Sequence, residues 1–115
     1  MATLTTQVVT RAGVLPTYAA AAGGGDAMQT GSDMMLHIKN AAASTMTVTL
    51  AIPSGVSGFA QAAYTNTAVV VPNASERMIG PVQSQLYSDP TTGFCTITYS
   101  AVTSVTVAAI NLQEP

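Results

Sequence analysis

The chain has 115 residues, of which 48% are apolar and only 7% are charged, and its formal net charge is −2. Charged residues make up about a quarter of a typical soluble domain, so their scarcity is the most unusual property of the composition. The basic residues Arg11, Lys39 and Arg77 are too few and too dispersed to form a nucleic-acid-binding face. No apolar run approaches the length of a membrane span, and no basic residue precedes an apolar run at the N-terminus. The sequence therefore predicts one domain with no membrane segment and no signal peptide.

The first third of the chain predicts little regular structure. Residues 4–12 are rich in threonine and valine, which favour strands, and Gly13 ends this stretch. We expect residues 1–13 to form an N-terminal arm. Residues 18–32 contain a run of four alanines followed by three glycines, which is too short and too flexible for a stable helix. This segment is predicted to be a long Ala/Gly-rich surface loop.

The clearest pattern in the chain is the alternation of apolar and polar residues over 34–39 and again over 45–52. Successive side chains of a strand leave opposite faces of a sheet, so a period of two predicts a strand in each segment. The small residues 41–44 between them suit the turn of a hairpin. We predict that the two strands pair and present one apolar face on which the rest of the chain packs. The residues expected on that face are Met34, Leu36, Ile38, Met46, Val48, Leu50 and Ile52.

Short strand patterns separated by turn residues continue to the end of the chain. They predict strands over 68–71, 76–79, 82–87, 94–99 and 102–112. The last of these is apolar on both sides toward its end, so it should be central or covered on both faces. The whole chain, 1–115, is predicted to be a single all-β domain. Its expected architecture is a compact sandwich or barrel of about eight short antiparallel strands, most similar to a jelly roll.

Residues that carry chemistry are few. His37 is the only histidine, and a strand would place it about 13 Å from Asp33 at roughly 3.3 Å per residue. We therefore expect a solvent-facing, non-catalytic histidine. Asp26 and Asp33 lack the ligand spacing of a calcium loop, and one histidine with one cysteine cannot complete a zinc site. Cys95 has no basic neighbour and is predicted to be a buried, inert thiol, so the sequence predicts no enzyme, metal or cofactor.

The shortage of charge predicts a protein surface that is covered in an assembly. A charge placed in a contact must be desolvated, at a cost of several kcal/mol unless it is well paired. Neutral polar groups and methyl groups are buried at much lower cost when their hydrogen bonds are made. The alternative is a neutral domain that remains a monomer.

Four groups of residues carry a resemblance to a known family. They are Thr5–Gly13 with Pro16–Tyr18, Leu36–Asn40, Val71–Pro72 with Glu76–Pro81, and Thr98–Ile110. In these stretches the sequence resembles small virion proteins of tailed bacteriophages and prophages, and the resemblance covers most of the chain. The resemblance is to capsid decoration proteins, also called cement or minor head proteins. The motifs are structural, so no catalytic or binding residue is transferred from the family.

The resemblance implies a structural protein on the outer surface of the virion capsid. Its expected partners are the major capsid protein and further copies of itself, with a trimer favoured. Residues 1–13 and 18–32 are expected to touch the shell, and Leu4, Leu15, Tyr18 and Met28 are the candidate interface anchors, a core position being the alternative for each. Two other functions remain open: a structural component of a phage tail, and a β-sandwich that binds carbohydrate on a host surface.

Overall fold

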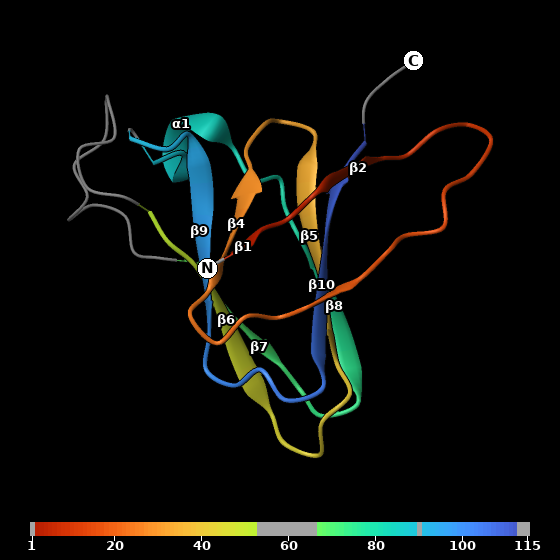
Figure 1. Cartoon of the computed structure of the whole chain (residues 1–115), viewed down its shortest axis with the longest axis vertical. Coiled ribbons are helices and arrows are strands. Elements are labelled where there is room, and N and C mark those ends of the chain that lie inside the picture. Colours follow the sequence, from red (N-terminus) through yellow and green to blue (C-terminus); the bar gives the residue numbers. More distant parts are fainter. Residues whose placement is uncertain (1, 53–66, 90, 113–115) are drawn as a thin grey trace.

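A computed structural model describes residues 2–52, 67–89 and 91–112 of the chain. This part folds into ten strands and one helical turn, and the strands form two layers that face each other across the core (Figure 1). The first layer, the β9 sheet, runs in the order β1 (Ala2–Thr3), β4 (Asp26–Gln29), β9 (Phe94–Tyr99), β6 (Met46–Leu50) and β7 (Thr67–Val71). The second, the β10 sheet, runs in the order β2 (Thr6–Val8), β10 (Val105–Asn111), β5 (Met34–Asn40) and β8 (Ser75–Ile79), with β3 (Ala19–Ala20) also paired to β10.

The predicted all-β class is confirmed, and the two open sheets make the fold a sandwich rather than a closed barrel. The number and direction of the strands differ from the prediction. Ten strands replace the expected eight within the described part, and two pairings, β1 with β4 and β2 with β10, are parallel. Residues 82–87 were predicted to form a strand, but Val82 inserts into the core and α1 (Ser84–Tyr87) follows as a single turn.

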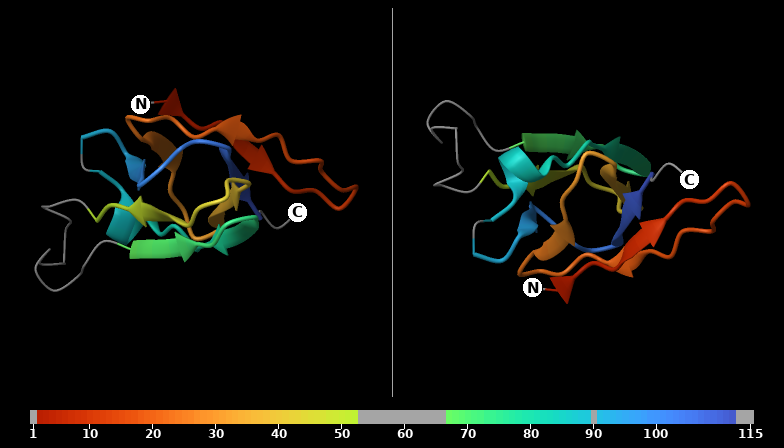
Figure 2. Two further views of the ribbon diagram at one scale, coloured as in Figure 1. Left: turned by 90° about the horizontal axis from the view of Figure 1, so that it is seen from below. Right: turned by 90° about the horizontal axis from the view of Figure 1, so that it is seen from above.

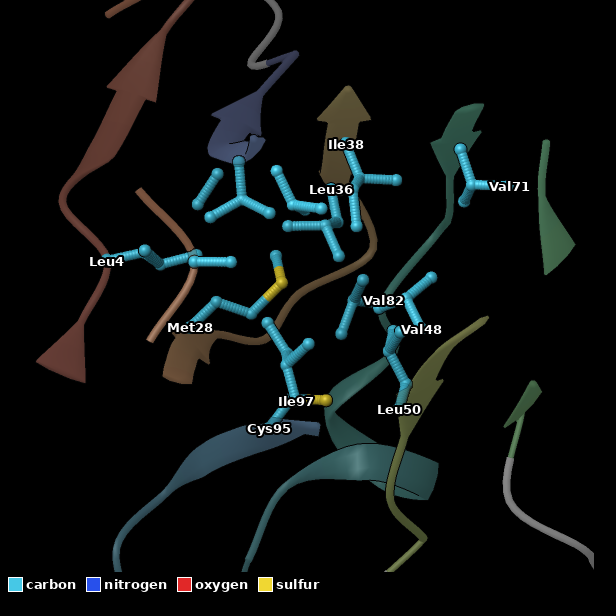
Figure 3. Close-up of a cluster of buried hydrophobic side chains, with 14 of the residues drawn as sticks. Leu4, Met28, Leu36, Ile38, Val48, Leu50, Val71, Val82, Cys95 and Ile97 are labelled. Atoms are coloured by element: carbon cyan, nitrogen blue, oxygen red, sulfur yellow. The ribbon is translucent and has the colours of Figure 1, made fainter. Parts of the chain in front are cut away.

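The core lies between the two sheets and is built from the apolar positions that the alternating pattern predicts (Figure 3). Leu36 and Ile38 of β5 face Val48 and Leu50 of β6, and each of these side chains is at most 1% exposed. The long C-terminal strand β10 is hydrogen-bonded on both edges and buried on both faces from Val107 to Ile110, as its apolar sequence predicts. Alternation therefore identified the inward faces correctly.

The predicted hairpin over residues 34–52 is wrong. β5 pairs with β10 and β8, whereas β6 pairs with β7 and β9, so the two strands belong to opposite sheets. The turn between them crosses from one layer to the other, and the buried Asn40 fixes this crossing. Its side-chain amide donates to the carbonyl oxygens of Ser44 (2.9 Å), Val71 (3.1 Å) and Pro72 (3.2 Å) and accepts from the backbone N–H of Ala42 (3.0 Å). These bonds replace the backbone pairing that a hairpin would have supplied.

The N-terminal residues are also better packed than predicted. β1 extends the β9 sheet and β2 extends the β10 sheet, so residues 2–8 close both layers at one end instead of forming an arm. Leu4, between the two strands, is buried, and its N–H donates to Ala27 at 2.7 Å. Segment 18–32 is likewise not one loop, because it contains β3 and β4. Gly25 permits the entry into β4: its φ is +94°, and a Cβ there would lie 2.7 Å from the Ile97 carbonyl oxygen.

Candidate functional site

A polar cluster lies on the outer face of the β10 sheet. His37 of β5 is buried, and its Nδ1 lies 2.7 Å from the Tyr18 hydroxyl while its Nε2 lies 2.7 Å from a carboxylate oxygen of Glu76 on β8. Because an ionised carboxylate only accepts, Nε2–H donates to Glu76, and in the neutral ring Nδ1 accepts from Tyr18. The ammonium of Lys39, two residues along the same strand, lies 4.0 Å from the centre of the Tyr18 ring. The cluster thus brings His37, Lys39 and Tyr18 together with the carboxylate of Glu76.

The expectation that His37 faces solvent is wrong, because Tyr18 covers it. Both ring nitrogens are engaged, one by a phenol and one by a carboxylate. A general base needs a free nitrogen within hydrogen-bond reach of a substrate proton. The geometry instead ties Tyr18 to the sheet, and Tyr18 leads into residues 19–20, which form β3 along β10. The cluster therefore holds in place the short segment 17–20, which we call the strap.

A loop of residues 9–17 projects from the β10 sheet beside this cluster (Figures 1 and 2). A side chain closes its base: the Gln7 amide donates to the Thr17 carbonyl at 2.6 Å and accepts from the Thr17 N–H at 2.7 Å. A turn closes its tip, where the Gly13 N–H donates to the Thr10 carbonyl at 3.0 Å. Val9 and Val14 are exposed, and Leu15 is 91% exposed. The fold thus fixes the base and the tip of this projecting loop, while its apolar side chains remain exposed to water.

The four predicted anchors fall into three different environments. Leu4 and Met28 lie in the core, 6% and 0% exposed, so the alternative assignment is correct for both (Figure 3). Tyr18 is half-buried and bonded to His37. Leu15 stands almost fully in solvent on the projecting loop. Of the four, Leu15 is the one that the fold leaves free to contact another molecule.

The outer face of the β9 sheet has a character that sequence analysis missed. Cross-strand partners share a face, and the register pairs Thr47 with Val70 and Thr49 with both Ala68 and Thr98. The alternation along each strand then assigns the remaining outward positions. We call this surface the threonine face, and its members are Thr3, Gln29, Thr47, Thr49, Ala68, Val70, Phe94, Thr96 and Thr98; Ala27 lies on the same side of the sheet but is buried. None of these residues is charged. The alternating threonines of residues 45–49 are the sequence signal from which this face could have been predicted.

The titratable groups of the β9 sheet are buried on its inner side. Cys95 is buried, as predicted, and this burial raises the pKa of its thiol to about 12. Burial, followed by the hydrogen bond to Asp26, raises the pKa of the Tyr99 phenol. Tyr99 donates to Oδ2 of Asp26 at 2.7 Å, and the Ala22 N–H donates to the same oxygen at 3.2 Å. Asp26 therefore fastens the turn before β4 to β9.

The structure does not bring the two loop aspartates into one site. Asp26 is buried against Tyr99, whereas Asp33 is exposed beside the start of β5. In the part of the chain that is described, no three His, Cys, Asp or Glu side chains are arranged to hold a metal ion. Over the same residues, no helix has the length and apolar character to cross a membrane.

The chain was compared with protein families, curated proteins and solved structures. No protein-family model, no curated protein and no solved structure matches the chain.

Proposed function

We propose that this chain is a structural virion protein that decorates the head of a tailed bacteriophage by binding the lattice of its major capsid protein. The observation that supports the proposal is the threonine face, an outer sheet surface built without a charged residue. We propose this face as the one that lies against the shell.

The chemistry of the threonine face suits burial against protein. Contact with a partner removes water from every group on the face, and an unpaired charge there would cost several kcal/mol. A threonine presents one methyl group and one hydroxyl, and the hydroxyl both donates and accepts, so it can satisfy varied partners. A face of this kind therefore loses little free energy on desolvation and gains from the burial of its methyl groups.

The resemblance of the sequence to decoration proteins supports the capsid as the partner. A decoration protein is present in many copies on one shell, so modest contacts at each copy sum to strong retention. With the threonine face inward, the outer face of the β10 sheet, which carries Lys39 and Glu76, would lie toward water. Charged side chains would then keep their hydration.

Binding to isolated heads tests this proposal. Heads are purified from particles that lack the chain, and binding of the full-length protein is measured by co-sedimentation. Thr98→Lys places a charge on the threonine face and is expected to weaken binding by about tenfold or more. Thr103→Lys makes the same change at another exposed threonine, in the turn before β10, and should bind as the wild type does.

Two results would overturn the proposal. One is equal binding by Thr98→Lys and wild-type protein. The other is a density map of the purified particle in which the chain is absent from the head, and its presence in the tail instead would favour the tail component.

A further inference from the structure

The large apolar side chains that the fold leaves exposed gather mainly in two places. Within the described residues, four of them belong to the projecting loop and the strand end before it: Val8, Val9, Val14 and Leu15. Met78 of β8 and Leu112, which directly follows β10, are 61% and 50% exposed and line one groove. Scattered apolar residues are ordinary on a protein surface, but grouped ones mark contact sites.

Met78 and Leu112 line a groove of about 370 Å³ where β5 begins and β8 ends. Met35 and Pro81 complete its apolar walls, and Asp33 is its one charged residue among those described. Methionine side chains adapt to the shape of an apolar guest because they are unbranched and flexible. The groove is therefore suited to accept one or two aliphatic side chains next to a cation.

The projecting loop carries both of these features. Leu15 and Val14 are aliphatic and exposed, and Arg11 lies in the turn at the tip. Neither Arg11 nor Asp33 has a side-chain partner within the described part of the chain. An arginine and a carboxylate form strong, often bidentate, charge-assisted hydrogen bonds. Loop and groove are thus complementary in both apolar character and charge.

The loop does not fill the groove of its own molecule. Leu15 is 91% exposed, and no loop residue lines the groove. The Gln7–Thr17 hydrogen bonds and the strap hold the loop so that it extends away from the sheets (Figure 2). A second molecule is needed to bring the two surfaces together.

We propose that the projecting loop of one copy docks into the groove between β5 and β8 of a second copy, with Leu15 and Val14 in the groove and Arg11 beside Asp33. The chain is then a self-associating protein with an interface distinct from the threonine face. This inference does not depend on the capsid proposal, because it concerns two copies of the chain alone.

Sedimentation equilibrium of the full-length protein over a wide concentration range tests the docking. The wild-type chain is expected to associate, and Leu15→Asp is expected to weaken association by about tenfold or more. Val70→Asp introduces the same charge at an exposed apolar residue on the threonine face and should leave association unchanged. A wild-type protein that remains monomeric throughout, or equal weakening by both variants, would overturn the proposal.

A charge exchange tests the orientation of the contact. Arg11→Asp and Asp33→Arg each place like charges together and are expected to weaken association, whereas the double variant restores the pair and should recover most of it. Both positions are exposed, so the fold is not at risk. A double variant no stronger than either single variant would exclude this pairing of loop and groove.

Discussion

The outer faces of the two sheets differ in where the chain has placed its few polar and charged groups. On the β10 sheet, His37, Lys39 and Glu76 are drawn together and covered in part by Tyr18. On the β9 sheet, threonines occupy the corresponding outward positions, and Cys95 and Tyr99 point inward. Composition alone predicts a surface poor in charge everywhere. Among the residues that the structure describes, the outer face of the β9 sheet has no charged side chain, whereas that of the β10 sheet keeps a small cluster. This difference distinguishes the face suited to burial from the face suited to water.

What the two sheets share is the core, and its loss should have the largest effect. Met28→Ala removes a side chain that is 0% exposed, and we expect it to lower the free energy of unfolding by about 3 kcal/mol. Leu15→Ala, at the most exposed of the predicted anchors, should change it by less than about 0.5 kcal/mol. Urea denaturation measures both. Similar losses for the two variants would mean that the projecting loop is packed in solution.

A smaller effect, for each pH unit, is expected on the stability from the buried thiol of the β9 sheet, Cys95. The ordinary thiol pKa is 9.0, and burial raises that of Cys95 to about 12 in the folded chain. Between these values the unfolded chain has lost the proton and the folded chain keeps it, so stability is full below pH 9 and falls at higher pH. We expect a loss of about 1.4 kcal/mol per pH unit from this group. Denaturation at several pH values should show a shallower fall for Cys95→Ala, and parallel profiles would contradict the assignment.

The smallest effect concerns the polar cluster of the β10 sheet. His37→Ala removes the partner of Tyr18, and we expect it to lower the free energy of unfolding by about 1 kcal/mol and to loosen the strap. Trypsin cleaves after Arg11 on the projecting loop, so limited proteolysis should be faster in the variant. Thr98→Ala, at an exposed threonine of β9 in the other sheet, is the control. Unchanged cleavage would show that the loop is held by Gln7 alone.

Alternation along the chain predicted the strands well but not their partners. The apolar positions of residues 34–52 are buried as expected, yet β5 and β6 lie in opposite sheets. A period of two states which side of a strand is apolar, and this is equally true of a hairpin and of two strands that face each other across a core. The deciding feature is the buried Asn40, whose hydrogen bonds reach residues 44, 71 and 72.

The candidate site was less predictable than the strands. Tyr18 and Leu15 were singled out, but the contact of Tyr18 with His37 joins positions 19 residues apart that no local pattern connects. Leu4 and Met28 were candidate interface anchors, with a core position as the alternative, because their segments looked unstructured. Short pairings of two to four residues, β1 with β4 and β4 with β9, place both side chains in the core instead. Such pairings are too brief to leave a period in the sequence.

The sequence by itself determined the all-β class, the inward faces of the long strands, the central place of residues 105–111 and the burial of Cys95. These follow from side-chain chemistry and from the two-residue repeat of a strand, which are local properties. Only the tertiary structure decided which sheet each strand joins, that the threonines share one uncharged face, and that the loop and the groove remain open. These depend on hydrogen bonds and contacts between distant residues, and no short stretch of sequence contains both partners.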